Sequence, residues 1–361
     1  MNNNTYDNRI AMDIDHINEE AFIQLCRKNN PRHFTRKRKF PLLPLVLSVP
    51  FRKGKTLYME LRHFKEVFNM DSQISKPGYL YQRKKLNPLA LHELMQFHAK
   101  NFFSDNSSVK LWKNRFLLLS VDGSSANVPL TKENIETYGS VSGKGKPRPQ
   151  MGISCMFEVN NHMVLDMSIN NCKFDERKCA LKHIESCKQL VQGYDSIHLF
   201  DRGYPSGGFL ITLTEKKLNF VIRLGSSSFK KEQLSMKSDD EWIDIVFDKS
   251  RLNAAKQKED QSDYEKMKAA GSIRLRFVRV KLSTGETEYL VTNMDSNMVP
   301  ASDMKELYHM RWGIETAYDE MKNRMQLENF SGSTPVIMKQ LLVIFNASEV
   351  FGEFVPDAET I

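Results

Sequence analysis

The stretch FLLLSVDGS at residues 116–124 decides the fold class of this chain. Its first six residues form a nearly continuous apolar run, which is typical of a β-strand buried on both faces. Asp122 and a glycine follow directly, and a glycine lets the chain turn sharply. We therefore expect a buried strand that ends at Asp122.

A second apolar run has the same form. Residues 196–200 read SIHLF and are followed by DRGY, so Asp201 also comes directly after a predicted buried strand. Ligands and catalytic groups collect at the carboxyl edge of strands in open α/β sheets. A carboxylate there costs desolvation free energy unless a cation compensates it. An aspartate close to a glycine also commonly begins a turn, so a functional carboxylate and a simple turn both remain open at each position.

The elements around these two runs predict an α/β core with an insertion. Further strands are expected at 150–159, 162–169 and 219–224, and helices at 17–27, 56–68, 88–103, 176–192 and 208–217. Residues 225–298 break this pattern, because a charged, loop-like stretch at 249–268 precedes a β-hairpin at 273–294. We interpret 225–298 as a β-rich insertion.

A long helix expected at 301–325 carries a third group of polar side chains. At 100° per residue, four of them fall within an arc of about 60°: Tyr308, Arg311, Glu315 and Lys322. An Arg and a Glu at this i,i+4 spacing also occur as an ordinary surface ion pair, worth a few tenths of a kcal/mol. Apolar residues interrupt the polar side of the helix, which favours a face that approaches the core. Trp312 falls on a different face, and we expect it to pack in the core.

Three carboxylates, two at strand ends and one on a later helix, suit a two-metal phosphoryl-transfer site. Mg²⁺ prefers a few carboxylates, with water and substrate phosphate completing its shell. One ion activates water or a 3′-hydroxyl, and the other stabilises the leaving oxygen. Neighbouring Arg and Lys side chains would hold phosphates.

Positive charge is concentrated near the N-terminus. The 361 residues include 52 Lys and Arg and 44 Asp and Glu, a net charge of +8. Residues 31–55 hold eight Lys or Arg and no acid, which equals the whole excess. A basic surface of this kind tracks nucleic-acid phosphates, although small basic clusters are often merely solvated. The candidate DNA-binding residues are Arg36, Lys37, Arg38 and Lys39, with Arg83, Lys84 and Lys85 from a second cluster.

These motifs together resemble a known family. Tyr308-x2-Arg311-x3-Glu315-x6-Lys322 is similar to the Y-(2)-R-(3)-E-(6)-K signature of DDE transposases of the insertion-sequence-four family. VDGS at Asp122, FDRGY at Asp201, the early HFTRKRKF and the later LENFSG resemble that family as well. The resemblance covers residues 30–335.

The resemblance implies cut-and-paste DNA transposition on an RNase H-like core. It implies 3′ nicking, a hairpin intermediate and strand transfer within a synaptic homodimer bound to double-stranded DNA, both terminal inverted repeats and target. By resemblance, Asp122, Asp201 and Glu315 are the catalytic residues and ligate Mg²⁺, with Mn²⁺ as an alternative. Tyr308, Arg311 and Lys322 would contact the DNA backbone near the cleaved phosphodiester.

The expected fold is therefore an α/β, RNase H-like catalytic core interrupted by a β-rich insertion, with a helical basic N-terminal region. The expected regions are a polar lead-in (1–30), a helical DNA-binding region (31–105), the first part of the core (110–224), the insertion (225–298) and the last part of the core with the Glu-bearing helix (299–361).

Two other hypotheses remain open. Residues 350–361 are short, acidic and unlike the family's continuation, so a truncated, transposition-inactive copy that occupies element ends is one alternative. An RNase H-like nuclease with another substrate is the other. Five cysteines without a CxxC pair and a polar N-terminus predict a cytoplasmic, nucleoid-associated protein that no membrane anchors.

Overall fold

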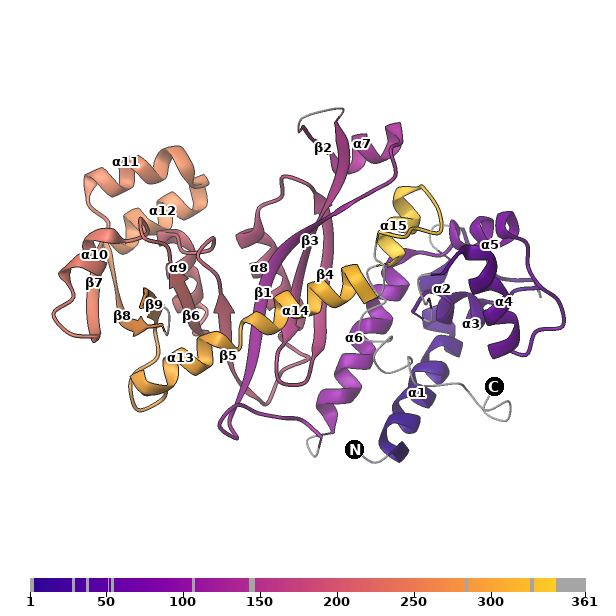
Figure 1. Cartoon of the computed structure of the whole chain (residues 1–361), viewed down its shortest axis with the longest axis horizontal. Coiled ribbons are helices and arrows are strands. Elements are labelled where there is room, and N and C mark those ends of the chain that lie inside the picture. Colours follow the sequence, from indigo (N-terminus) through magenta and orange to yellow (C-terminus); the bar gives the residue numbers. More distant parts are fainter. Residues whose placement is uncertain are drawn as a thin grey trace.

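One mixed β-sheet runs through the centre of the molecule, with helices on its faces and at both ends (Figure 1). The structure is a computed structural model, and it describes residues 3–27, 30–36, 39–50, 52, 55–105, 108–142, 147–282, 285–324 and 328–341. The strands are β1 (Phe116–Asn127), β2 (Ser140–Val141), β3 (Arg148–Glu158), β4 (Met163–Asn171), β5 (Asp195–Phe200), β6 (Asn219–Leu224), β7 (Asp240–Val246), β8 (Ser272–Lys281) and β9 (Thr287–Thr292). They follow the order β2-β3-β1-β5-β6-β9-β8-β7, and β4 pairs with β3.

The strand β1 lies between an antiparallel and a parallel neighbour. It pairs antiparallel with β3, which pairs in the same way with β4. On its other side it pairs parallel with β5, which pairs parallel with β6. The predicted α/β class and the strands expected around the two apolar runs are confirmed.

β1 is longer than its apolar run. The strand continues past Asp122 to Asn127, because the residues from Gly123 onward keep pairing with β3. Pairing with β5 ends earlier, at Ser120. The apolar run therefore marks only the part of β1 that has a strand on both sides, and the expected chain turn at Gly123 was wrong.

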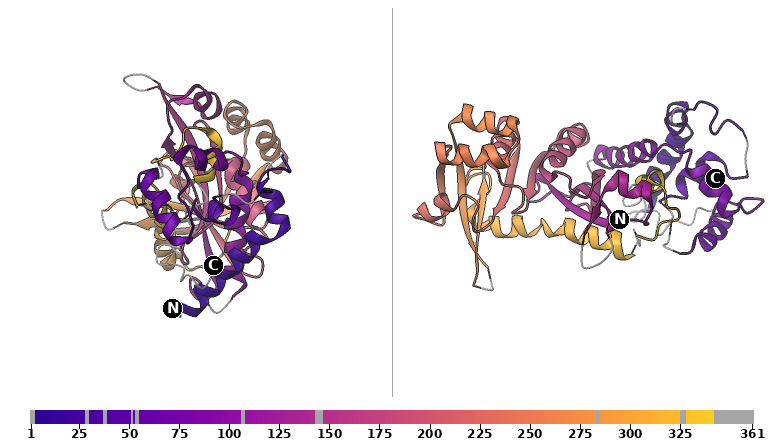
Figure 2. Two further views of the ribbon diagram at one scale, coloured as in Figure 1. Left: turned by 90° about the vertical axis from the view of Figure 1, so that its right-hand side faces the viewer. Right: turned by 90° about the horizontal axis from the view of Figure 1, so that it is seen from above.

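Helices gather at both ends of the sheet, with α1–α6 and α15 at one end and α10–α12 at the other (Figures 1 and 2). The helices are α1 (Asn3–Asn18), α2 (Glu20–Cys26), α3 (Leu42–Leu47), α4 (Leu57–Val67), α5 (Lys76–Arg83), α6 (Pro88–Ser104), α7 (Lys132–Tyr138), α8 (Glu176–Cys187), α9 (Gly207–Glu215), α10 (Lys230–Ser235), α11 (Lys249–Lys258), α12 (Gln261–Ala270), α13 (Ala301–His309), α14 (Trp312–Asp319) and α15 (Pro335–Leu341), with a π-helical turn η1 at Glu320–Arg324. The polar start of the chain is largely helical, and Ile10 and Ile17 of α1 are buried. Among the described helices, none has the length and apolar character needed to cross a membrane.

The segment 225–298 extends the central sheet. β9 pairs with β6 of the core, and β8 and β7 continue outward from it. The stretch 249–268, expected as a loop, forms α11 and α12 instead. Asp248 and Asp260 cap these helices by accepting hydrogen bonds from backbone N–H groups of their first turns. The high charge of this stretch suggested a loop, whereas the two capping aspartates mark the starts of two helices.

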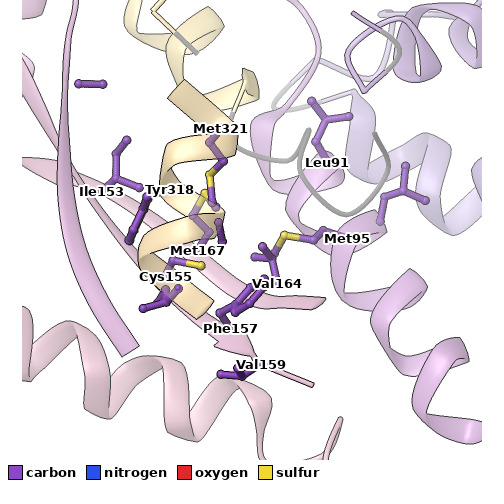
Figure 3. Packing of buried hydrophobic residues seen from close by; sticks show 14 of the residues in the cluster. Leu91, Met95, Ile153, Cys155, Phe157, Val159, Val164, Met167, Tyr318 and Met321 are labelled. Carbon is purple, nitrogen blue, oxygen red and sulfur yellow. The ribbon is translucent and has the colours of Figure 1, made fainter. Parts of the chain in front are cut away.

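Two helix layers cover opposite faces of β1. Leu118 packs in one cluster with Tyr318 of α14, part of which Figure 3 shows, whereas the residues on either side of Leu118 pack with Ile184 of α8. Side chains alternate between the two faces along a strand. Asp122 therefore faces the α14 layer, and Gly123 faces the α8 layer.

Candidate active site

The sheet register brings the two predicted aspartates to one edge. Along the parallel pair β1–β5, Ser120 lies opposite Leu199. Pairing stops there, so Asp122 and Asp201 each lie two residues past the last pair, and the charge of Asp201 helps to raise the pKa of Asp122. Residues 79 positions apart in sequence thus become neighbours at the carboxyl end of β5.

Both carboxylates are held by the backbone beside them. Oδ1 of Asp122 accepts a hydrogen bond from the N–H of Gly123 at 2.8 Å, and Oδ1 of Asp201 accepts one from the N–H of Gly203 at 2.7 Å. Asp201 does begin a turn, as one of the two hypotheses for it stated, whereas Asp122 lies within a continuing strand. A turn and a site at the sheet edge are therefore compatible for Asp201.

The helix that carries Glu315 is not continuous. It divides into α13 and α14 at Met310 and Arg311, and it ends in the π-helical turn η1. Figure 1 shows α13 and α14 running across the sheet from β8 toward β4. α14 approaches the sheet closely at Gly313, where an added Cβ would lie 2.8 Å from the side chain of Val159. The predicted helical face is therefore divided between three successive segments.

Arg311 connects the helix to the strand edge. Its guanidinium lies 3.5 Å from the Asp122 carboxylate and also pairs with Glu315. Its Cζ lies 5.8 Å from the ring centroid of Tyr308. Arg311 and Tyr308 are buried, at 4% and 3% exposure, while the Glu315 side chain is 42% exposed. Arg311 thus contacts Asp122, Glu315 and the ring of Tyr308.

Two further hydrogen bonds fix α14 and η1 against β1. The hydroxyl of Tyr318 donates to the backbone oxygen of Asp122 at 2.9 Å. Nζ of Lys322 donates to Oγ of Ser124 at 2.7 Å. Lys322, the last signature residue, therefore joins the same strand two residues beyond Asp122.

Electrostatics at this edge disfavour the ionised form of Asp122. The pKa of Asp122 is raised to about 6, mostly by burial and in smaller part by the charges of Asp201 and Glu176. The hydrogen bond from Gly123 and the charge of Arg311 offset only part of this effect. Burial also raises the pKa of Tyr308 to about 12. The edge thus carries more negative charge than its neighbours neutralise.

The donor chemistry fits a hard divalent cation. Carboxylate oxygens from Asp122, Asp201 and Glu315 are the ligand type that Mg²⁺ and Mn²⁺ prefer. Within the described ranges, however, no three His, Cys, Asp or Glu side chains converge closely enough to hold an ion. Instead, the guanidinium of Arg311 pairs with two of the acids. The three carboxylates would have to change partners in order to converge.

Sequence patterns did not point to two other residues at this edge. Glu176, the first residue of α8, lies against Gly123, where an added Cβ would meet its Oε1 at 2.4 Å. Tyr204 is fully buried, and its hydroxyl has no hydrogen-bond partner among the described residues. Burial raises the pKa of Tyr204, and the charges of Glu176, Asp122 and Asp201 add to that effect. Only the DRGY motif hinted at Tyr204.

The predicted DNA-binding residues fall into different environments. Arg36, Lys39 and Lys84 are exposed, and Lys85 is half-buried with its Nζ 3.9 Å from the ring centroid of Tyr81. The side chains of Arg32, Arg36 and Lys85 line one pocket of about 170 Å³. The two basic segments of the sequence therefore meet in space. Lys37 and Arg38 lie outside the described residues.

Arg83 does not belong to this basic surface. It is fully buried, and its guanidinium donates hydrogen bonds to Gln340 at 3.0 Å and to Ser331 at 2.7 Å. In this structure Arg83 joins α5 to α15, and tertiary packing separates it from its exposed neighbour Lys84. The predicted DNA contact of Arg83 would require that it leaves these partners.

Trp312 is also placed differently from the expectation. It is 51% exposed and lines a groove of about 630 Å³ together with Leu282 and Leu290. The interruption of the helix just before Trp312 turns its side chain away from the core.

A second polar cluster, away from the edge, was also missed. The carboxylate of Asp166 hydrogen-bonds to Nε2 of His92 at 2.5 Å and to Nδ1 of His183 at 2.9 Å. Nε2 of His183 lies 3.0 Å from Oγ of Ser154. Burial alone would raise the pKa of Asp166, but the hydrogen bonds from both histidines lower it well below its usual range.

Comparison of the sequence with models of known protein families identifies the class of protein. A family model for the transposase DDE domain matches residues 114–347, well over half of the chain. The chain therefore belongs to the DDE transposase family, whose members are metal-dependent enzymes that cleave DNA and transfer its strands.

Individual relatives narrow this class. The chain is 23% identical over 330 residues to the transposase InsG for insertion sequence element IS4 from Escherichia coli (strain K12), covering 86% of this chain and 68% of that protein. The predicted insertion-sequence-four family is thus confirmed. Among solved structures, the chain is similar to the piggyBac transposase in a cryo-EM synaptic complex with hairpin DNA, at 11% identity and a TM-score of 0.48, covering 96% of this chain and 77% of that one.

Proposed function

We propose that the chain catalyses cut-and-paste transposition of an insertion sequence, with Asp122, Asp201 and Glu315 as its catalytic carboxylates. One observation supports this proposal: Arg311 pairs with both Asp122 and Glu315. Asp122 and Asp201 each lie two residues past the last β1–β5 pair, and the charge of Asp201 acts on Asp122. The proposed RNase H-like core comprises β1 and β3–β6 with α8 and α9, and the family relationship supports it.

Mg²⁺ or Mn²⁺, when bound, would activate the attacking oxygen and stabilise the leaving oxygen. The chain's own residues would bind and orient DNA around that chemistry. Lys322 donates to Ser124, so a role at a phosphate requires that Lys322 exchanges this partner. Arg311 and Tyr308 are buried, so a role at the DNA backbone requires that DNA binding exposes them.

The N-terminal basic surface would hold DNA away from the cleavage point. Arg32, Arg36 and Lys85 already share one pocket, and Lys39 and Lys84 are exposed. Such phosphate contacts supply affinity and salt dependence but little sequence specificity. The finer parts of the proposal are a hairpin intermediate, a synaptic homodimer on terminal inverted repeats, and activity at the nucleoid. They rest on the resemblance of the sequence motifs to the insertion-sequence-four family.

A cleavage experiment tests this function. The purified chain would be incubated with Mg²⁺ and DNA carrying the terminal inverted repeats of its element. We expect 3′ nicking that Glu315→Gln abolishes and Glu136→Gln preserves, since Glu136 is a 65% exposed side chain paired only with Lys132. Binding without cleavage by the unaltered chain would overturn the proposal and favour an inactive copy that occupies element ends. Residues 350–361, on which the truncation hypothesis depends, lie outside the described residues.

A further inference from the structure

Glu176 begins α8 at the sheet edge that carries the catalytic aspartates. The carboxylate of Asp175 caps this helix by accepting hydrogen bonds from the N–H groups of Arg177 and Lys178. The cap leaves the side chain of Glu176 free to point toward β1. α8 packs on the face of β1 opposite α14. Glu176 therefore approaches the edge from the helix layer that the three-acid signature does not include.

Gly123 provides the space that this approach requires. A Cβ added to Gly123 would lie 2.4 Å from Oε1 and 2.7 Å from Cδ of Glu176, so any side chain at this position would displace the Glu176 carboxylate. The Glu176 carboxylate therefore lies directly over the β1 backbone, one residue from Asp122. Because this glycine has no side chain, carboxylates from both faces of the sheet can reach the same edge.

The cations next to Glu176 are engaged elsewhere. Arg177 pairs with Glu259 at 2.7 Å, and Lys178 pairs with Asp260 at 3.1 Å. Among the described residues, the carboxylate of Glu176 itself forms no hydrogen bond and no ion pair. A residue of this kind adds negative charge to an already acidic edge, and nothing in the described fold neutralises it.

A buried hydroxyl gives independent evidence for a ligand at this edge. Tyr204 is 0% exposed, and its hydroxyl is without a hydrogen-bond partner in the part of the chain that the structure describes. It lies within electrostatic reach of Glu176, Asp122 and Asp201. A buried hydroxyl left unpaired destabilises the fold, because it gives up its hydrogen bonds to water without replacement. A metal-bound water, or a carboxylate turned toward a cation, would supply the missing acceptor.

We propose that Glu176 is a fourth carboxylate ligand of the divalent-cation site, and that the Tyr204 hydroxyl orients the ligands there. This inference rests on the proposed function, because it assumes a cation at Asp122 and Asp201. Glu176 binds the cation from the α8 side, and the acids on β1, β5 and α14 bind from the other. Glu176 could instead have a purely structural role, since an acidic side chain in the first turn of a helix interacts favourably with the helix dipole and stabilises the helix.

Binding of Mn²⁺ to the full chain without DNA tests the inference. Electron paramagnetic resonance would measure the concentration of free Mn²⁺ in titrations of the unaltered chain and of three variants. We expect Glu176→Gln and Asp201→Asn each to weaken Mn²⁺ binding by about tenfold or more. Glu185→Gln is the matched control on the same helix, since its side chain is 63% exposed and pairs with Lys216, and it should bind as the unaltered chain does.

Thermal melting separates a ligand from a structural acid. A ligand role predicts that Glu176→Gln reduces the rise in melting temperature produced by Mn²⁺. A role in the helix dipole predicts an equal loss with and without Mn²⁺, which would overturn the inference. Glu176→Asp keeps the charge at the helix start but shortens the reach, so we expect it to melt normally without metal and to respond less to Mn²⁺.

The outcomes distinguish this inference from the proposed function. If Asp201→Asn weakens Mn²⁺ binding and Glu176→Gln does not, the fourth ligand is wrong while the proposed site stands. If neither variant changes Mn²⁺ binding, the cation site itself is wrong, and the proposed function fails with it.

Discussion

Two partly buried aspartates in this chain experience opposite environments. Asp166 lies between two histidines, whose hydrogen bonds overcome the effect of burial and lower its pKa. Asp122 lies at the sheet edge, where burial dominates and raises its pKa to about 6. The difference teaches that burial alone does not decide the role of a carboxylate. The hydrogen bonds of Asp166 more than offset its burial, whereas Arg311 and the Gly123 N–H offset only part of the burial of Asp122.

The largest change in the free energy of unfolding is expected at Asp166, whose charge is fully paired within the fold. Asp166→Ala removes the shared partner of His92 and His183, which bind it from α6 and α8. Breaking a buried, paired charge costs about 3–5 kcal/mol. We expect urea unfolding to show a loss of that size at pH 7. Asp244→Ala, at an exposed position of β7, is the control and should unfold as the unaltered chain does. Equal midpoints for both variants would refute a stabilising role for Asp166.

Asp122→Asn should act in the opposite direction. The pKa of Asp122 rises on folding from 3.8 to about 6, so its stabilising contribution is present below pH 4 and lost as pH rises through 6. The metal-free variant should therefore be more stable than the unaltered chain at pH 8, by up to about 3 kcal/mol. The gain should vanish at pH 4. Unfolding curves at both pH values measure it, and an Asn variant that is less stable at pH 8 would contradict the comparison.

Arg83, like Asp166, is a buried charged side chain whose hydrogen-bond partners lie within the fold. Arg83→Ala leaves Gln340 and Ser331 without their buried donor, which we expect to cost about 2 kcal/mol. Thermal or urea unfolding measures this loss. The salt dependence of DNA binding by the folded variant should stay unchanged, and a changed salt slope would mean that Arg83 does contact phosphate.

The smallest effect on stability is expected for substitution of Lys84, the neighbour of Arg83. Lys84 is exposed, so Lys84→Ala should leave unfolding unchanged. If Lys84 contacts a DNA phosphate, the slope of log binding constant against log salt should fall by about one. Titrations of element-end DNA at several salt concentrations measure that slope. A stability loss without a slope change would show that Lys84 resembles Arg83.

Sequence reasoning found the residues whose signal is local. Asp122 and Asp201 follow apolar runs, and Glu315 belongs to a spaced signature on a helix. It missed Glu176, because the only mark of that residue is its contact with Gly123, 53 positions earlier in the chain. It also treated Arg83 and Lys84 alike, since charge on a helix does not reveal which side faces α15.

The sequence by itself determined the α/β class and the family signature and proposed the three acids, because periodicity and motif spacing act over a few residues. Tertiary structure alone decided that β1 continues past Asp122, that Arg311 pairs with both Asp122 and Glu315, and that the side chain of Glu176 lies against Gly123. Strand register and helix packing set these contacts, and both depend on burial between segments that are far apart in the chain. The same burial fixes which charges are compensated, so the charge state of a site cannot be read before the fold is known.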